Sequence, residues 1–331
     1  MAKKLIVAPS PHLHGGESTR RIMRDVIIAL LPAFAISVIH FGVDALAVTA
    51  LSVACCLLFE YLFSRFMMGK ATTNDLSAVV TGILLGFNLP ANIPLWIVVI
   101  GSLVAIGVAK MSFGGIGKNP FNPALVGRVF LLIAYPVQMT SFPRVSGAVV
   151  DVFSGATPLA SMKGALKVST EAGADVLSKA VNFQDMMFGA IPGSLGEVAS
   201  LMLILGGVYL LWRKVISWHI PVAVLGSMAV VALLYGVLMG FECVAALQFG
   251  AFHILAGGAI LGAVYMATDY SSSPMNHTAM LIYGVGIGVI TMMIRLWGAY
   301  PEGMSFAILI MNGCVPLLNK YIKPKRFGVQ K

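Results

Sequence analysis

The chain has 331 residues, of which 58% are hydrophobic and only 11% are charged, and its mean hydropathy is +0.91. Because soluble domains carry about 25% charged residues, this composition excludes an ordinary soluble protein and predicts an all-α, polytopic membrane protein. The formal net charge of +9 does not indicate a nucleic-acid-binding face, since the basic residues fall between apolar runs and at the C-terminal tail. That distribution is typical of positive-inside membrane anchoring.

The chain opens with a polar and basic arm over residues 1–24, which we expect to lie on the cytoplasmic surface of the membrane. Apolar runs of spanning or near-spanning length follow near residues 25–42, 44–63, 76–89, 94–111, 123–139, 197–212, 219–239, 245–267, 279–297 and 304–319. A helix that crosses the bilayer needs about 20 residues. The third and fifth runs are short and contain Gly, Asn or Pro, so they predict broken or tilted helices that line a cavity. We therefore predict about ten transmembrane helices.

The two halves of the chain resemble each other weakly. Residues 82–86 read G-I-L-L-G and residues 258–262 read G-A-I-L-G, and each is followed by a Gly-rich apolar span. Five spans in each copy would invert the second copy relative to the first. The sequence thus predicts two inverted five-helix repeats, separated by a long polar loop and followed by a basic cytoplasmic tail: a first membrane repeat at 25–139, the loop at 140–196, a second membrane repeat at 197–319 and the tail at 320–331.

Loop charges predict the orientation. With the N-terminus inside, the inner loops hold the basic residues Arg65, Lys70, Lys110, Lys118, Arg213 and Lys214, and the tail holds five more. The short outer loops near 43, 90–93, 240–244 and 298–303 hold no Lys or Arg. This asymmetry predicts that both termini are cytoplasmic and that the loop 140–196 is extracytoplasmic.

That loop contains the stretch D-V-F-S-G-A-T over residues 151–157, followed by Pro158. Small residues before Thr157 leave the backbone open, and Pro158 keeps Thr157 out of helical geometry. We therefore expect the Thr157 hydroxyl on an exposed loop, where it could accept a phosphoryl group in an ester link. A plain turn between membrane segments is the alternative.

Three polar residues stand out near or within the apolar runs. Arg128 in the fifth run needs a partner or a cavity, because a charge at mid-membrane costs a few kcal/mol; snorkelling to the inner surface is the alternative. Asp269 follows a long span, where it could bind a cofactor or a cation, or else cap the turn through Ser271–Ser273. His253 is expected to be a core histidine with satisfied nitrogens rather than a ligand.

The pattern D-x-x-S-G-A-T resembles the flavinylation motif of bacterial membrane redox complexes, in which flavin mononucleotide (FMN) is joined through its phosphate to the final threonine. Further segments resemble the D subunit of the Rnf (Rsx) ion-translocating electron transport complex, at residues 10–12, 18–20, 25–26, 29–33, 117–124 and 267–269. The same family includes the B subunit of the sodium-translocating NADH:quinone reductase, whose usual longer N-terminal extension has no counterpart here. The chain departs from the family at Tyr270, where proline often follows A-T-D.

The resemblance implies a flavoprotein subunit in the bacterial cytoplasmic (inner) membrane. The complex would couple electron transfer between ferredoxin and NAD to translocation of sodium ions or protons. FMN would be covalently bound at Thr157, and the motif residues Asp151, Ser154, Gly155 and Ala156 are the implied cofactor-binding residues. From its position in the fifth apolar run, Arg128 is a further candidate that could pair with the flavin phosphate or a flavin ring oxygen. A second, noncovalent flavin (riboflavin) is a further hypothesis, for which Asp269 is the candidate residue.

Other Rnf-type subunits, a flavin transferase and the lipid bilayer are the implied partners. The chain has neither a G-x-G-x-x-G fingerprint in a βαβ setting nor an iron–sulfur spacing, so we expect NADH and ferredoxin to meet other subunits. The alternative is a small-solute channel or transporter of inverted-repeat fold, which would not need D-x-x-S-G-A-T.

Overall fold

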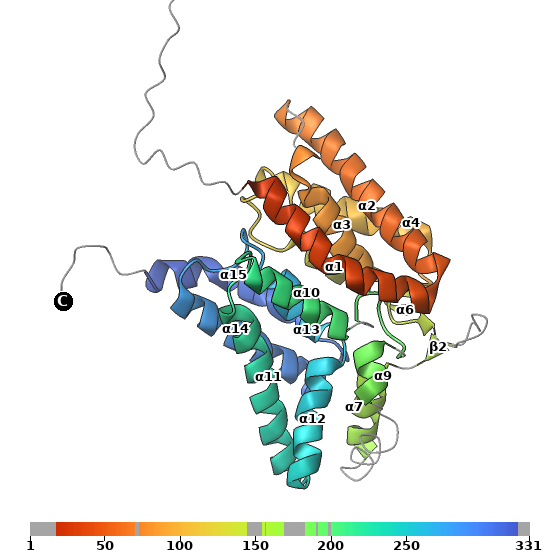
Figure 1. The fold of residues 1–331 in the computed structure, drawn as a ribbon, viewed down its shortest axis with the longest axis vertical. Helices are drawn as coiled ribbons and strands as arrows, with labels where there is room; N and C mark the ends of the chain where they lie inside the picture. The colour runs from red at the N-terminus through yellow and green to blue at the C-terminus, as the bar shows by residue number, and fades with distance from the viewer. Residues whose placement is uncertain are drawn as a thin grey trace, which may run out of the picture.

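The computed structural model describes residues 18–69, 73–143, 154–155, 157–168, 183–189, 191–197 and 200–323. Helices make up most of this part of the chain, so the all-α prediction is confirmed. They form two groups that lie side by side, the N-terminal half in red to yellow and the C-terminal half in green to blue (Figure 1).

The N-terminal half contains five main helices and several short turns. These are α1 (Thr19–Phe41), α2 (Val43–Phe63) with its π-helical continuation η1 (Ser64–Met68), η2 (Thr73–Asp75), α3 (Ser77–Phe87), α4 (Leu95–Leu103) with its continuation η3 (Val104–Val108), η4 (Met111–Phe113), α5 (Pro123–Ala134) and α6 (Pro136–Met139). Asn122 caps α5, because its side-chain oxygen accepts the amides of Ala124 and Leu125 and Pro123 occupies the first helical position.

The C-terminal half contains a similar set of helices. Its helices are α10 (Ser200–Trp212), α11 (His219–Leu238), α12 (Cys243–Leu255), α13 (Ala259–Leu261) with its continuation η6 (Gly262–Met266), α14 (His277–Trp297) and α15 (Met304–Tyr321). The segment from α12 to η6 is bent by 62° at the break between α12 and α13.

The segment between the halves carries the shorter elements. Strand β1 (Phe142–Pro143) pairs antiparallel with β2 (Ser154–Gly155), with Phe142 opposite Gly155, and this is the only ladder in the described part of the chain. Helices α7 (Pro158–Val168) and α9 (Phe183–Phe188) follow and lie beside α12 (Figure 1).

Several helices are long and apolar enough to cross a membrane. Five qualify alone, namely Thr19–Phe41, Val43–Met67, Leu95–Phe113, His219–Leu238 and His277–Trp297, and the bent pair Cys243–Leu255 and Ala259–Met266 makes up to six. The apolar helices Ser77–Phe87, Pro123–Ala134 and Ser200–Trp212 are shorter. The third and fifth apolar runs thus form short helices, and the chain is a multi-pass membrane protein.

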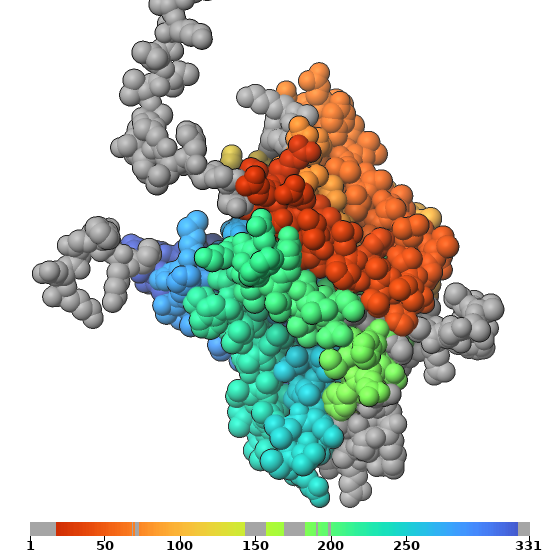
Figure 2. Space-filling view, viewed as in Figure 1, coloured from red at the N-terminus to blue at the C-terminus, as the bar shows by residue number. Residues whose placement is uncertain are grey.

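Small residues allow the helices to approach closely, as is typical of packing within membranes. At Gly284 of α14, an added Cβ would lie 2.6 Å from the Cβ of Ala223 in α11. At Gly206 of α10, an added Cβ would overlap the carbonyl of Ala29 in α1. This second contact joins the two halves, which meet along α1 and α10 on the face shown in Figure 2.

Candidate functional site

Thr157 occupies the N-cap position of α7. Its hydroxyl oxygen accepts a hydrogen bond from the Ala160 amide at 3.2 Å, its carbonyl accepts the Ser161 amide at 3.0 Å, and Pro158 is the first helical residue. The prediction that Pro158 keeps Thr157 outside the helix is confirmed. The prediction of an exposed hydroxyl is wrong, because Thr157 is only 6% exposed. The hydroxyl satisfies an amide at the helix start that has no partner within the helix.

The rest of the flavinylation motif is only partly described. Ser154 and Gly155 form β2, which places the motif beside the segment that follows α6. Asp151 and Ala156 lie outside the described residues. The structure therefore places the threonine and the backbone of two motif residues.

Helix α7 packs on the break between α12 and α13. Leu159 and Met162 are buried, and the Leu159 Cδ1 atom lies 2.7 Å from the point that a Cβ at Gly257 would occupy. Gly257 also has φ +65°, a conformation that favours glycine. Because Gly257 has no side chain, the break leaves space for Leu159 in the first turn of α7.

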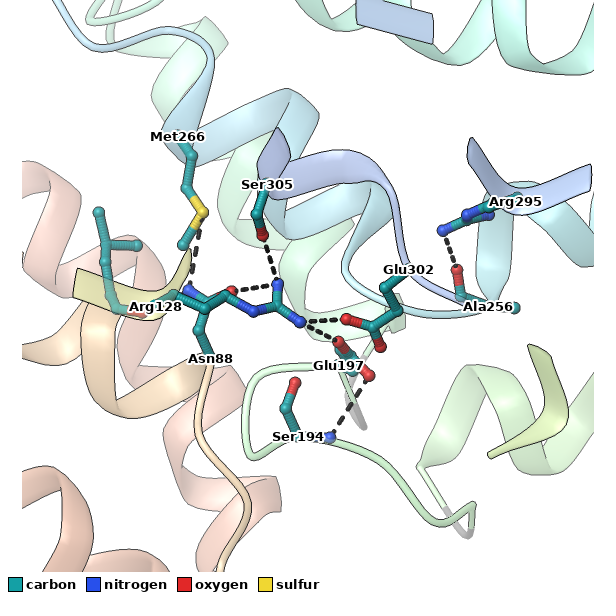
Figure 3. Close-up of polar contacts among 10 residues, drawn as sticks. Asn88, Arg128, Ser194, Glu197, Ala256, Met266, Arg295, Glu302 and Ser305 are labelled. Carbon is teal, nitrogen blue, oxygen red and sulfur yellow. Dashed lines mark hydrogen bonds and ion pairs between the residues drawn. The ribbon is translucent and has the colours of Figure 1, made fainter. Parts of the chain in front are cut away.

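Arg128 is the centre of a buried polar cluster that joins the two halves (Figure 3). Its Nη1 atom donates to Asn88 Oδ1 and to Ser305 Oγ, both at 2.8 Å. Its Nη2 atom pairs with Glu302 and lies 3.5 Å from Glu197 Oε1. Arg128 is 6% exposed, so the snorkelling alternative is wrong and the expectation of a partner is confirmed.

The two carboxylates of this cluster differ in their electrostatics. Glu197 precedes α10, and its Oε2 atom accepts the Ser194 amide at 3.3 Å. Burial, together with the charge of Glu302, raises the pKa of Glu197 to about 8. Burial also opposes ionisation of Glu302, but the Arg128 guanidinium outweighs it and lowers the pKa of that carboxyl. The arrangement can therefore hold one proton on Glu197 beside the Arg128–Glu302 ion pair.

The cluster lies against the same helix break as α7. A Cβ at Gly258 would lie 3.5 Å from Glu197 Oε1 and 3.7 Å from Arg128 Nη1. Sequence reasoning did not single out Glu197, Glu302 or their neighbours. The available signal was the buried arginine itself, because a charge in an apolar run requires partners, and acidic residues at the edges of other runs are the natural candidates.

A second polar site is formed in part by residues of the segments 117–124 and 267–269. A cavity of about 90 Å³ is lined by Lys110, Asn119, Asn122, Thr268 and Asp269, among others. Asp269 Oδ2 accepts hydrogen bonds from Ser271 Oγ at 2.9 Å and Ser272 Oγ at 3.0 Å, which confirms the turn-capping alternative. Burial raises the pKa of the Asp269 carboxyl.

Met266 connects this cavity to the Arg128 cluster. Asn122 Nδ2 donates to the Met266 carbonyl at 3.1 Å, and Asn88 Nδ2 lies 3.7 Å from the Met266 sulfur. The N-P-F-N-P-A and A-T-D segments, distant in sequence, are thus held together. The structure brings Asp269 and Asn122 to one cavity and Arg128 and α7 to the helix break.

His253 is a core histidine, but its nitrogens are not satisfied as expected. It is 3% exposed, and neither ring nitrogen has a hydrogen-bond partner among the described residues. Its ring lies edge-on to Phe249 and Phe252. A buried polar group without a hydrogen-bond partner costs free energy. His253 therefore differs from ordinary buried polar residues, whose polar atoms are hydrogen-bonded.

Comparison with known proteins identifies the family. The family model described as "NQR2, RnfD, RnfE family" matches residues 6–328. The chain is 42% identical to the D subunit of the Na(+)-translocating ferredoxin:NAD(+) oxidoreductase complex of Acetobacterium woodii, over 99% of this chain and 96% of that protein. It is 39% identical to the D subunit of the proton-translocating ferredoxin:NAD(+) oxidoreductase complex of Clostridium ljungdahlii, over 98% and 96%.

A more distant relative agrees. The chain is 35% identical to the D subunit of the ion-translocating oxidoreductase complex of Escherichia coli strain K12, over 98% of this chain and 99% of that protein. The resemblance of the sequence to the Rnf D subunit is thereby confirmed over nearly its whole length. The chain belongs to the NQR2, RnfD, RnfE family.

Proposed function

We propose that this chain is the flavin-carrying D subunit of an Rnf-type complex, which couples electron transfer between ferredoxin and NAD to ion translocation. The names of its relatives support the reaction class. The observation that carries the flavin assignment is D-x-x-S-G-A-T, with its threonine at the start of α7. The relatives differ in the ion that they move, so their names support no choice between sodium and protons.

The position of Thr157 suits a phosphate ester. The first amides of a helix have no partner within it, and the helix dipole favours negative charge at that end. The Ala160 amide, which donates to the Thr157 hydroxyl, would therefore favour the negative charge of a phosphate ester at this position. When bound there, FMN supplies reversible electron transfer, and the ester prevents its loss from the protein.

The burial of Thr157 bears on how the ester forms. A transferase can reach this hydroxyl only if the start of α7 opens, or before α7 packs on Gly257. We propose Asp151, Ser154, Gly155 and Ala156 as the segment that the transferase reads. The small residues among them admit a close backbone approach.

We propose a positioning role for Arg128 rather than a direct flavin contact. Both of its terminal nitrogens are engaged by Asn88, Ser305, Glu197 and Glu302. These partners fix the helix break on which α7 rests. Arg128 would thus act on the flavin site indirectly, by stabilising the helix break against which α7 packs.

The second flavin does not fit the cavity beside Asp269 as the structure has it. Asn119, Asn122 and Lys110 offer suitable hydrogen-bonding groups. The volume of about 90 Å³ is well below the 300–1,000 Å³ or so of usual cofactor pockets. We therefore assign riboflavin no site here.

We also propose ten spans in two inverted repeats. Each predicted apolar run contains at least one apolar helix, and the run at 245–267 contains the bent helix pair. Helix α2 packs on α3 and α4, and α4 on α5; in the same way α11 packs on α12 and α14, and α14 on α15. The recurring pattern supports an internal repeat.

The contacts of the loop 140–196 support its extracytoplasmic placement. His40 near the end of α1 contacts the Phe188 carbonyl in α9 at 3.0 Å, and Lys163 of α7 donates to the Ile294 carbonyl near the end of α14 at 3.2 Å. At the opposite end of α1, Asp25 pairs with Arg213 at 3.1 Å. If the N-terminus is cytoplasmic, the first two contacts lie on the outer side of the bacterial cytoplasmic membrane. The third contact then lies on its cytoplasmic side.

Denaturing electrophoresis tests the proposed function. A band that fluoresces under ultraviolet light is expected at the 35.0 kDa of this chain. A purified, active complex in which this chain shows no such band would contradict the flavin role.

A further inference from the structure

A second cavity, of about 120 Å³, lies between α7 and the C-terminal half. Its polar lining comes from four helices: Lys163 and Lys167 of α7, Tyr235 of α11, His253 of α12 and Arg295 of α14. No acidic side chain lines it among the described residues. The lining of the cavity therefore collects positive charge and contains no carboxylate among the described residues.

Two cationic groups of the lining, Arg295 and Lys163, donate to neutral carbonyls. Arg295 donates to the carbonyls of His253 and Ala256, and its Nε atom has no hydrogen-bond partner among the described residues. Lys163 donates to the carbonyls of Ile294 and Tyr300, at 3.2 and 2.9 Å. Partial burial and the nearby Lys167 charge lower the pKa of Lys163.

His253 adds the second feature of a binding site. It is buried at 3% exposure on the wall of this cavity, and both ring nitrogens lack partners among the residues that the structure describes. A carboxylate lies nearby at Glu302, since this group and Arg295 Nη2 both lie within 3.6 Å of the Cβ position of Gly257. Arg128 binds that carboxylate, which does not line the cavity. An anion with several oxygens would satisfy the donors that remain.

The surroundings indicate a membrane interface. Tyr235 packs edge-on against Trp297, which is 66% exposed at the end of α14. Tyr and Trp gather at the interfaces of the bilayer. Leu234 and Leu238, four residues apart on α11, are 60% and 85% exposed and offer apolar surface nearby.

The size of the cavity limits the ligand. Its volume of about 120 Å³ is well below the 300–1,000 Å³ or so of usual cofactor pockets, so the cavity suits a phosphate group and not a flavin ring system. A phosphate group matches the donors of the lining, because Lys and Arg form charge-assisted hydrogen bonds with phosphate oxygens.

We propose that this cavity binds the phosphate of an anionic membrane phospholipid. Lys167 and Arg295 supply charge, and His253 supplies the buried hydrogen bond. The lipid would hold α7, and thus Thr157, against α11, α12 and α14. This site is independent of the flavin assignment.

The test uses the purified complex and a photoactivatable phosphatidylglycerol. Cross-links should map to peptides of α7 and α14. Unlabelled phosphatidylglycerol should compete, whereas phosphatidylcholine and millimolar inorganic phosphate should not. Equal competition by phosphatidylcholine would overturn the anionic site, and displacement by inorganic phosphate would show that a free ion is the ligand instead of a lipid.

Two variants sharpen the result. Lys167→Gln and His253→Phe, which keeps an aromatic ring against Phe249, should each weaken labelling about tenfold, as expected for loss of a charge-assisted hydrogen bond. Lys214→Gln, the same change at an exposed lysine after α10, should leave labelling unchanged. Labelling of both variants at the level of Lys214→Gln would overturn the proposal, and the competition on the unmodified complex decides it if a variant fails to assemble.

Discussion

Arg128 and Glu197 face each other inside the protein, with Nη2 of the guanidinium 3.5 Å from Oε1 of the carboxylate. Arg128 comes from α5 in the N-terminal half, whereas Glu197 precedes α10 in the C-terminal half. Because the break that carries Gly257 and Gly258 lies against both this pair and α7, the contact between the halves also supports the start of α7 at Thr157.

Replacement of Arg128 should destabilise the protein strongly. Arg128→Leu leaves the ionised Glu302 buried without its cation, which typically costs about 3–5 kcal/mol. Thermal unfolding of the purified complex should show this loss, and Arg128→Leu combined with Glu302→Gln should recover part of it. Arg65→Leu, at an exposed arginine, should change stability by no more than about 0.5 kcal/mol. A fully stable Arg128→Leu protein would contradict the cluster.

Stability should depend on pH through Glu197. Its pKa is about 8 in the folded protein against an ordinary value of 4.5. Between these values the unfolded chain has lost a proton that the folded chain keeps, so this contribution is fully present below pH 4.5 and is lost as pH rises through 8. The slope approaches about 1.4 kcal/mol per pH unit.

The matching measurement is the unfolding temperature between pH 5 and 8.5 or so. Glu197→Gln should flatten the decline, because the amide does not titrate. Glu242→Gln, at an exposed glutamate, should keep the slope of the unmodified protein. If Glu197→Gln leaves the slope unchanged, another group is responsible.

Gly257→Ala should loosen α7. The added Cβ would lie 2.7 Å from Leu159 Cδ1, so the helix must shift. Gly240→Ala is a matched control, because Gly240 has a similar left-handed backbone with φ +81° and no atom within 4 Å of the added Cβ. Both changes cost roughly 1–2 kcal/mol of backbone strain, but only Gly257→Ala should increase hydrogen exchange in α7. Equal exchange in the two variants would show that α7 does not rest on Gly257.

Much of the local structure could be predicted from the sequence. The Thr157–Pro158 pair predicts a residue held outside a helix, and the serines after Asp269 predict the turn that it caps. The apolar runs predict helices, including the short α3 and α5. These features depend on neighbouring residues alone.

The burial of Thr157 and the partners of Arg128 could not be predicted in this way. Thr157 is buried where α7 packs on a glycine 100 positions later, and Arg128 meets Ser305 across 177 positions. Such contacts depend on how the two halves dock and where the α12–α13 segment breaks. Charge patterns in the sequence indicate that a buried arginine needs partners but not which residues supply them.

The predicted topology places α7 outside the cytoplasm. Ser161 is exposed on this helix, so a cysteine there, with the native cysteines replaced, should react with an impermeant maleimide added to intact cells. A cysteine at Val329 in the basic tail should react only after the membrane is opened. The reverse pattern would contradict the orientation.

The central claim is that Thr157 carries FMN, and the mass of the intact chain tests it most directly. The chain should exceed its sequence mass by one flavin mononucleotide minus water. Thr157→Ala should return to the sequence mass, at a cost of about 1 kcal/mol for the lost N-cap, while Thr157→Ser keeps the nucleophile and the cap. Thr140→Ala, which removes a threonine hydroxyl bound to the Pro136 carbonyl, should retain the added mass. If Thr157→Ala still carries the flavin mass, the anchor lies elsewhere and the account is wrong.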